Sequence, residues 1–510
     1  MTEHYLVRLS KTIAENWDSP ALTDFYLTED GTARDVSRGN RYTYGEMYGK
    51  MLGLAGMFRR LGIRKGDHIA ICGSNSANWA VAYLAIAAYQ GVVVTVLYSQ
   101  TADDIADQLE FSDAVALFTD IELWEELKER NFSQLHTVIS LEDYSVLCGM
   151  KAEPSVVSIK PLDCQLSHGS LDDLAMICFT SGSTSVSKGV MLTYRNISYT
   201  IAYQVFYLQR FTHKNTISLL PLGHIYGCID EFVRNMYLGT SVYILRDVSS
   251  VAQIIQCYRI IQPCYVVLVP FLLNYLVQHI PEDNPHSYLT DTFGEKIEKI
   301  FVAAAELSHD VELKLLHAGF PILKGYGATE CSPSIANSIT WKQKIGSVGK
   351  VVANTQIQIS NIGEILVKGE NVMLGYYKNP EATAQKIDKD GWLHTGDAGW
   401  LDDDGYLYVT GRLGQDMIVL PNGENIHPED IETKLNVLPQ VKESVVVARE
   451  GKLVALVVLN DGEYCDNQET NILNLVNPQL PLFSQLDKIE FLSEPIQYTA
   501  KHTIKRYLYK

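Results

Sequence analysis

The first two thirds of the chain alternate between apolar residues at helical spacing and short continuous apolar runs. Residues 44–61 (YGEMYGKMLGLAGMFRRL) have the helical spacing, and Gly62 follows as a stop signal. The next run, residues 68–72 (HIAIC), predicts a buried strand. This alternation predicts parallel sheets with helices on their faces. Further predicted helices and strands cover residues 102–111, 114–118, 196–211, 216–220, 241–245, 265–269, 271–280, 299–304 and 321–324.

One stretch, residues 79–98, has the length of a membrane span and almost no charge. Gln90-Gly91 divides it into an alanine-rich half, AVAYLAIAAY, and a β-branched half, VVVTV. A buried helix followed by a buried parallel strand explains this change of composition better than a bilayer does. We therefore expect no transmembrane segment.

The pattern changes near Gly346 to short alternating runs broken by glycine, SVGKVV, TQIQIS and GEILVKG. These runs predict antiparallel strands that form a small β-barrel over about residues 345–410, with DDDG as a hairpin turn. In the tail that follows, Pro428 opens a helix, and residues 444–449 and 453–459 pair as a hairpin.

These patterns together predict an α/β fold with two domains, as the length of 510 residues also requires. The large N-terminal domain, residues 1–412, is expected to contain two parallel-type α/β sheets and the small β-barrel. The small C-terminal domain, residues 413–510, is expected to be α+β and mobile.

Composition and charge narrow the classes of function. A net charge of −18 argues against binding nucleic acid, which favours a basic surface. The nine cysteines contain no CxxC pair, which predicts reduced thiols and a cytoplasmic protein. The N-terminus has no apolar core of signal-peptide length. Peripheral association with a membrane is an alternative, although no basic amphipathic helix in the sequence supports it.

The candidate chemistry centres on residues 180–189, TSGSTSVSKG, between the apolar runs MICF and VML. Glycines let a backbone approach a ligand closely, and hydroxyl and N–H groups donate to anionic oxygens. The segment therefore suits phosphate, although it is not a GxxxxGK[ST] loop. A solvated linker has a similar composition, so this stretch alone leaves both readings open.

Four further stretches follow in order along the chain: GYGATE, WLHTGD, GYLYVTGR and NGENIHPEDIE. With residues 180–189, and with GSNSANW and PLGHIYG before and after them, they resemble the AMP-forming adenylating superfamily of acyl-CoA synthetases, carrier-loading adenylation domains and luciferases. The resemblance covers nearly the whole chain. The segments PLGHIYG, VPFLL and GFPILKGYGATECSP are most similar to bacterial long-chain fatty acyl-CoA ligases.

This resemblance implies a two-step reaction. A carboxylate attacks the α-phosphate of ATP to give an acyl-adenylate and pyrophosphate, and coenzyme A then takes the acyl group. The expected substrate is a medium- or long-chain fatty acid, and Mg²⁺ is the expected cofactor. Two alternatives stay open: an acyl-AMP ligase that loads a separate acyl carrier protein, and a catalytically impaired homologue that binds a nucleotide or acyl-adenylate.

The resemblance also implies site residues. Thr184 and Glu330 are expected to bind Mg²⁺, Tyr326 to lie against adenine, and Asp397 and Arg412 to bind ribose. The full set expected to contact ATP or coenzyme A is Thr180, Ser181, Gly182, Ser183, Thr184, Lys188, Ala304, Ala305, Tyr326, Gly327, Ala328, Thr329, Asp397, Arg412 and Gly423.

The expected roles of His224 and of the C-terminal lysine each have an alternative. His224 in PLGHIYG is expected by analogy to gate the acyl pocket, whereas most histidines so placed are merely satisfied polar residues. The superfamily's C-terminal catalytic lysine aligns with Thr503, so Lys501 or Lys505 is expected to replace it. Gly414 is expected to act as the hinge of the C-terminal domain.

Overall fold

The structure is a computed structural model and describes most of the chain. It describes residues 2–509 except 155–159, 181–187, 209–212, 249, 269, 282–283, 304–308, 320–321, 339–343, 414–417, 420–424, 427, 450–451, 461–466, 481–483 and 499–503. Backbone contacts divide the chain into two compact units. Unit 1 comprises Met1–Ile357, Val367–Leu393 and Asp402–Leu407, and unit 2 comprises Gln358–Leu366, His394–Leu401 and Tyr408–Lys510.

The largest sheet of unit 1 has eight strands in the order β19-β9-β8-β4-β3-β5-β6-β7. The five strands β8, β4, β3, β5 and β6 are parallel, and antiparallel strands close the sheet on both sides. This arrangement confirms the predicted parallel sheet. The strands are β3 (His68–Cys72), β4 (Val92–Thr95), β5 (Ala116–Thr119), β6 (Thr137–Ser140), β7 (Val146–Cys148), β8 (Leu174–Thr180), β9 (Lys188–Thr193) and β19 (Gly375–Tyr376).

The uncharged stretch over residues 79–98 is a helix followed by a strand, as predicted. Helix α3 (Ala77–Tyr89) is buried on nearly all sides, and Gln90 ends it in the left-handed conformation. Strand β4 then lies between β3 and β8, with every residue buried. Among the described residues, no helix is long and apolar enough to cross a membrane. The other helices near this sheet are α2 (Tyr44–Arg60), α4 (Ala102–Phe111), α5 (Ile121–Leu127), η1 (Pro161–Asp163) and α12 (Pro380–Lys386).

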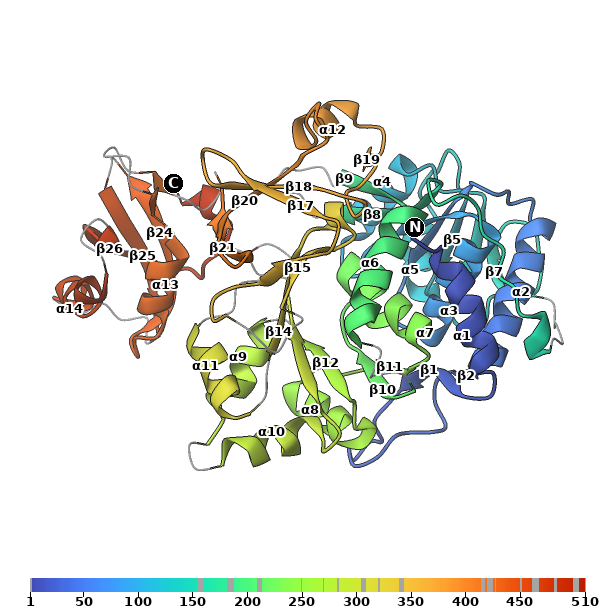
Figure 1. Ribbon diagram of the computed structural model, residues 1–510, viewed down its shortest axis with the longest axis horizontal. Helices are drawn as coiled ribbons and strands as arrows, with labels where there is room; N and C mark the ends of the chain where they lie inside the picture. The colour runs from blue at the N-terminus through green and yellow to red at the C-terminus, as the bar shows by residue number, and fades with distance from the viewer. Residues whose placement is uncertain are drawn as a thin grey trace. The chain divides into compact units, whose positions relative to one another are not determined.

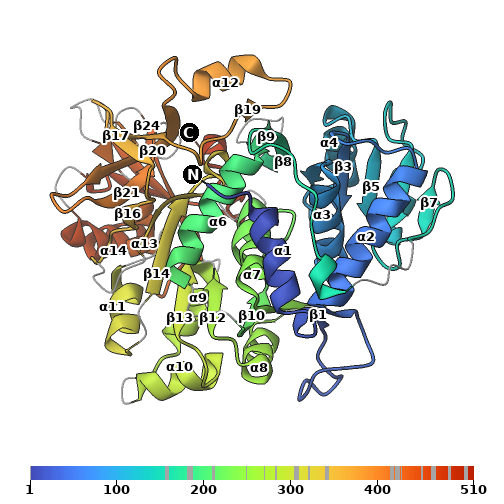
Figure 2. The same cartoon turned by 45° about the vertical axis from the view of Figure 1, so that its right-hand side comes forward.

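A four-stranded sheet in the order β10-β11-β1-β2 lies in the same unit. Its strands are β1 (Pro20–Phe25), β2 (Arg41–Thr43), β10 (Asn215–Ser218) and β11 (Ser241–Leu245). Helices α6 and α7 run side by side next to it, with α1 against both (Figures 1 and 2). These helical elements are α1 (Tyr5–Glu15), α6 (Tyr194–Leu208), the π-helix η3 (Gly227–Val233) and α7 (Arg234–Leu238).

The third group of strands in unit 1 runs in the order β12-β13-β14-β15-β16, parallel up to β14 and antiparallel from there. An apolar core of buried side chains from its strands and neighbouring helices supports it. The strands are β12 (Tyr265–Leu268), β13 (Lys299–Val302), β14 (Ile322–Gly327), β15 (Ser334–Asn337) and β16 (Gly349–Val351), and the helical elements are α8 (Val251–Ile261), α9 (Pro270–Gln278), α10 (Pro285–Phe293), α11 (His309–His317) and η4 (Thr329–Cys331).

Unit 2 contains most of four strands that follow one another in the order β21-β20-β18-β17, and a separate three-stranded sheet in the order β24-β25-β26. The hairpin β24–β25 confirms the one predicted from the sequence. The elements are β17 (Gln356–Ile359), β18 (Glu364–Lys368), β20 (Leu393–Leu401), β21 (Tyr406–Arg412), β22 (Ile418–Val419), β23 (Asn425–Ile426), α13 (Pro428–Asn436), β24 (Val441–Arg449), β25 (Lys452–Leu459), α14 (Gln468–Val476), η5 (Asn477–Gln479), β26 (Lys488–Phe491) and η7 (Arg506–Leu508).

Candidate active site

The predicted phosphate loop joins two antiparallel strands, β8 and β9. Thr180, the last residue of β8, pairs with Lys188, the first residue of β9. The strands therefore bring the two ends of the loop together. Seven of the predicted nucleotide and coenzyme contacts lie outside the described residues: Ser181, Gly182, Ser183, Thr184, Ala304, Ala305 and Gly423.

Lys188 and Glu330 both interact with one aromatic residue, Tyr376. The Lys188 Nζ lies 5.1 Å from the centroid of the Tyr376 ring, and the Tyr376 hydroxyl donates to Glu330 Oε1 at 2.7 Å. The pairing of β19 with β9 sets Tyr376 opposite Val190 and so beside Lys188. The structure thus brings together a cation and a carboxylate that are far apart in the sequence.

The local backbone explains how Glu330 reaches this position. Gly327 ends β14, and a Cβ at this residue would lie 1.6 Å from the carbonyl oxygen of Pro333, so only glycine permits this approach. The short helix η4 carries Thr329 and Glu330 immediately afterwards, and Met373 N–H donates to the Glu330 carbonyl at 2.9 Å. Tyr326 lies in β14 opposite Ala336.

In unit 2, a hydrogen-bonded turn holds Asp397. Gly396 adopts φ 79°, and its N–H donates to Glu364 Oε1 at 3.0 Å. The N–H of Asp397 donates to Thr395 Oγ1 at 3.0 Å. Leu413 N–H donates to the Gly396 carbonyl at 2.7 Å, which brings the end of β21, and with it the Arg412 backbone, beside this turn.

The segment around the predicted replacement lysines is attached to α13. Arg506 forms a forked ion pair with Glu432, and one of its two contacts is 3.0 Å long. Both side chains are buried. This buried pair anchors the backbone that carries Lys505, the residue directly before Arg506. Lys501, together with Thr503 and Gly414, lies outside the described residues.

The turn that carries His224 is held by the side chain of Asn75, from the GSNSANW stretch. Asn75 Nδ2 donates to the Leu220 carbonyl at 2.8 Å, and Leu222 N–H donates to Asn75 Oδ1 at 2.8 Å. His224 Nδ1 accepts from Tyr226 N–H at 3.2 Å, so a neutral imidazole here carries its proton on Nε2.

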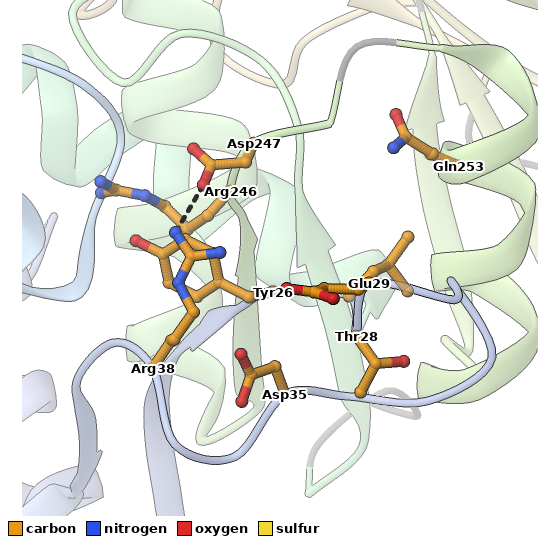
Figure 3. A pocket seen from close by; sticks show the side chains of 9 residues that line it. Tyr26, Thr28, Glu29, Asp35, Arg38, Arg246, Asp247 and Gln253 are labelled. Atoms are coloured by element: carbon orange, nitrogen blue, oxygen red, sulfur yellow. Dashed lines mark hydrogen bonds and ion pairs between the residues drawn. The ribbon is translucent and has the colours of Figure 1, made fainter.

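Arg246 connects this turn to a surface pocket of about 280 Å³. Its guanidinium donates to the Asn75 carbonyl and lies near the Tyr26 ring, on which Arg38 also packs (Figure 3). Arg38 pairs with Asp247 at 2.8 Å. Among the described residues, none of those predicted for the active site lines this pocket, and its cations are already bound by protein groups. Arg246 therefore supports the Asn75 turn, and the pocket is not part of the predicted site.

Replacing Asn75 with alanine is expected to disturb the His224 turn specifically. The variant leaves the Leu220 carbonyl and the Leu222 N–H without their partner, which costs about 1–3 kcal/mol per buried group. We expect the KM for the carboxylate to rise about tenfold while the KM for ATP changes little. Asn78→Ala is the control, since Asn78 is a buried asparagine of the same stretch but donates to the carbonyls of Leu141 and Glu142. An equal effect of both variants on the carboxylate KM would contradict this role.

A buried carboxyl group also supports the turn. Glu231 Oε2 accepts from the N–H groups of Leu219 and Leu220 at 2.9 and 2.8 Å. Burial raises the pKa of Glu231 to about 8, against the opposing effect of these backbone donors. Glu231 is therefore protonated in the folded chain at neutral pH.

This pKa shift predicts a stability that falls as pH rises. Between its ordinary pKa of 4.5 and about 8, Glu231 keeps a proton in the folded chain that it loses in the unfolded chain. The folded state binds more protons, so the free energy of unfolding decreases across this window. Glu231→Gln cannot titrate and is expected to flatten that decrease, as measured by urea unfolding between about pH 5 and about pH 8. An unchanged slope would show that other groups produce it.

Sequence reasoning missed two features of this region. Tyr376 follows Glu330 by many residues, and no local pattern marks it; only the pairing of β19 with β9 brings it in. Most residues of the run 225–233 are apolar, but the structure also buries the acidic side chains of Asp230 and Glu231 within it. The i, i+4 spacing of Asp230 and Arg234 was the available signal. The predicted helix over residues 271–280 contributes Leu272, Leu273, Leu276 and Val277 to the apolar core.

The donors near Glu330 fit a magnesium ion bound together with phosphate. Among the described residues there is no cluster of three or more histidine, cysteine or acidic side chains that could hold a metal. Mg²⁺ is commonly held by one or two carboxylates with the remaining positions filled by substrate phosphates and water. One carboxylate, Glu330, near the end of the loop at Lys188 agrees with that mode of binding.

Comparison with known proteins identifies the family. The AMP-binding enzyme model matches residues 10–377, and the model of the AMP-binding enzyme C-terminal domain matches residues 415–509. The chain therefore belongs to the AMP-binding enzyme family. This confirms the superfamily resemblance, whereas the resemblance to long-chain fatty acyl-CoA ligases in particular stays a prediction.

Individual relatives share less than a third of their residues with this chain. A 4-coumarate–CoA ligase-like protein of Arabidopsis thaliana is 28% identical, over 93% of this chain and 87% of the relative. A 2-succinylbenzoate–CoA ligase of Oceanobacillus iheyensis is 30% identical, over 82% of each chain. These relatives are named for aromatic acids.

Solved structures confirm the fold. The o-succinylbenzoate CoA synthetase of Bacillus subtilis, solved with an acyl-adenylate intermediate, superposes with a TM-score of 0.78 at 24% identity, covering 99% of this chain and 98% of that chain. ATP-bound MatB of Rhodopseudomonas palustris gives a TM-score of 0.77 at 21% identity, with the same coverage. At these identities the likeness concerns the fold alone.

Proposed function

We propose that this protein is an ATP-dependent, AMP-forming acyl-CoA ligase. The observation that carries the proposal is the contact of Glu330 and Lys188 through Tyr376, at the end of the predicted phosphate loop of a chain that matches both AMP-binding models in order. Relatives named as CoA ligases along most of the chain support the coenzyme A step.

The proposed reaction has two steps. In the first, a carboxylate oxygen of the acid forms a bond to the α-phosphorus of ATP, and the bond between the α-phosphorus and its bridging oxygen breaks to release pyrophosphate. In the second, the thiolate of coenzyme A attacks the acyl carbon, and AMP leaves with the electrons of the broken C–O bond. Positioning and charge stabilisation carry both steps, so no covalent enzyme intermediate is required.

In unit 1, Lys188 and the loop residues Thr180–Thr184 would hold the β- and γ-phosphates by charge and hydrogen bonds. Glu330 and Thr184 would bind Mg²⁺, which when present neutralises charge on the phosphate oxygens. Tyr376 would orient the Glu330 carboxylate through its 2.7 Å hydrogen bond. Tyr326, with the backbone of Gly327–Thr329, would lie against the adenosine, and His224 would gate the acyl pocket.

In unit 2, the Asp397 carboxylate would accept hydrogen bonds from the ribose hydroxyls, and Arg412 would bridge ribose and phosphate. Lys501 or Lys505 would stabilise charge on the α-phosphate during the first step, in place of the lysine that Thr503 lacks. Gly423 would face the coenzyme A arm during the second step. The domain boundary at residues 412/413 and the cytoplasmic location expected from the sequence stay part of this proposal.

The sequence and the relatives point to different acids as the substrate. The sequence favours a medium- or long-chain fatty acid, whereas the relatives are named for 4-coumarate and 2-succinylbenzoate. Both groups of acids have an apolar body, which would suit the aromatic and aliphatic side chains around η3.

The test is pyrophosphate release from ATP with a panel of alkyl and aryl acids, followed by mass spectrometry of the product. We expect AMP and an acyl-CoA thioester. Release of pyrophosphate without a thioester when free coenzyme A is supplied would favour transfer to a carrier protein. Failure to cleave ATP with every acid, despite ATP binding, would favour the impaired homologue to which Thr503 points.

A further inference from the structure

Three successive helical elements bring together a cluster of buried polar side chains. Gln204 of α6, Asp230 of η3 and Arg234 of α7 form this buried polar cluster. Asp230 Oδ1 accepts from Gln204 Nε2 at 2.6 Å and from Arg234 Nη1 at 2.9 Å. The three residues are only 6%, 5% and 3% exposed. Such a cluster in a core requires an explanation, because well-packed apolar residues are often at least as stable as a buried ion pair.

Several polar atoms of the cluster are buried without a partner. Within the part of the chain that the structure describes, Gln204 Oε1, Asp230 Oδ2 and the Nε and Nη2 of Arg234 make no hydrogen bond. The amide assignment follows from chemistry, because the Asp230 carboxylate only accepts and so must face the Gln204 nitrogen. Buried polar atoms are nearly always paired, so two acceptors and two donors left over in one place require a partner that the described residues do not supply.

The cluster lies next to the candidate active site. Gln204 Nε2 also donates to Ser334 Oγ at 2.9 Å, and Ser334 pairs with Gly327, three residues before Glu330. The π-helix that carries Asp230 begins three residues after His224. A π-helical turn inside an α-helix is frequently found at functional sites. An acid whose carboxylate is activated near Glu330 could therefore extend its far end toward Asp230.

The charges of the cluster restrict what that far end can be. Arg234 balances Asp230, and burial keeps the neighbouring Glu231 protonated, so the cluster has no net charge. A second carboxylate on the substrate would place an unbalanced anion beside Asp230, which is costly in a buried site. The guanidinium of Arg234 lies 5.6 Å from the ring centroids of both Tyr265 and Phe301, so the surroundings are aromatic. A neutral group that both donates and accepts matches the unpartnered atoms, and a hydroxyl is the smallest such group that an organic acid can carry.

We propose that the acid activated by this ligase carries a hydroxyl group at the end remote from its reacting carboxylate, and that Gln204, Asp230 and Arg234 bind that hydroxyl. The hydroxyl donates to Asp230 or Gln204 and accepts from Arg234. The cluster is thus the specificity determinant of the acyl pocket. This inference rests on the proposed ligase function.

The experiment compares pairs of acids that differ only in the far hydroxyl. One pair is 3-phenylpropenoic acid and its para-hydroxy derivative, and the other is octanoic acid and its terminally hydroxylated derivative. For the pair whose length fits, we expect kcat/KM to favour the hydroxylated acid by about tenfold to a hundredfold, because the plain acid leaves buried polar groups unpaired. A preference for the plain acid, or none, in both pairs overturns the inference.

Two variants assign any preference to the cluster. Gln204→Met keeps the volume and removes the amide, and is expected to reduce the preference about tenfold. The double variant Asp230→Leu/Arg234→Met replaces the ion pair by apolar side chains, a change that is often tolerated. It is expected to reverse the preference in favour of the plain acid. Retention of the wild-type ratio by folded Gln204→Met protein would place the hydroxyl elsewhere and overturn the assignment.

Asn78→Leu is the control for the loss of a buried amide. Asn78 donates to the carbonyls of Leu141 and Glu142 at 2.7 and 2.8 Å, and neither residue belongs to the cluster. It is expected to lower the thermal midpoint without changing the ratio between paired acids. If the double variant does not fold, the inference is tested by the kcat/KM ratio between paired acids in the wild type and in Gln204→Met. Absence of AMP with every acid overturns the ligase proposal itself, whereas AMP formation without a hydroxyl preference overturns only this inference.

Discussion

Glu330→Gln is expected to lower the rate of pyrophosphate release by about 10²–10³-fold. The amide keeps the shape of the side chain and can still accept from the Tyr376 hydroxyl, which lies 2.7 Å from Glu330 Oε1. It removes the negative charge that would hold Mg²⁺ against the triphosphate. The apparent KM for Mg²⁺ is therefore expected to rise together with the loss of rate. Both quantities are obtained from ATP–pyrophosphate exchange measured over a range of magnesium concentrations.

Two further variants test whether the loss of rate comes from the Glu330 charge. Tyr376→Phe removes only the hydrogen bond that orients the carboxylate, and we expect a loss of at most about tenfold. Glu381→Gln alters an exposed carboxylate of α12 and should leave exchange unchanged. Wild-type exchange by Glu330→Gln at every magnesium concentration would remove Glu330 from the proposed metal site.

The double variant Lys501→Ala/Lys505→Ala is expected to lower the first step by about 10²–10³-fold, the usual cost of losing one charge that stabilises a transition state. The chain has Thr503 where the superfamily has lysine, so one of these neighbours must supply the charge if adenylation is efficient. Two residues along an extended chain keep a side chain on the same face but shift it by about 7 Å. The second step, started from supplied acyl-adenylate, is expected to be unaffected.

The single variants show which lysine acts. The Arg506–Glu432 ion pair fixes the backbone beside Lys505. Lys488→Ala is the control, because Lys488 is an exposed lysine of unit 2 that pairs with Glu490. Pyrophosphate release at the wild-type rate by the double variant would exclude a displaced lysine and leave the first step to other charges.

Much of the fold could be predicted because local patterns decide it. The alanine-rich and β-branched halves of residues 79–98 became α3 and β4, since side-chain entropy and packing favour those states. Strand ends were less certain: the strand predicted at 321–324 extends to Gly327, because its continuation pairs with β15, which the sequence does not mark.

The candidate site was predicted only where a motif is contiguous. Lys188, Glu330 and Asp397 stand inside short recognisable stretches, so their order along the chain was informative. The partners that orient them were not predicted. Tyr376 reaches Glu330 through a two-stranded pairing, and Glu364 holds the Asp397 turn through the N–H of Gly396.

The sequence by itself determined the succession of helices and strands, the family and the residue types available for phosphate and metal. These depend on interactions among residues a few positions apart, which a linear pattern records. Only the tertiary structure decided which side chains meet. Gln204, Asp230 and Arg234 come from three elements, and their contacts arise when α6, η3 and α7 pack together. Strand register and the packing of distant segments set such contacts. A buried polar atom has no access to water, so its hydrogen-bond partner is whichever group the fold places beside it.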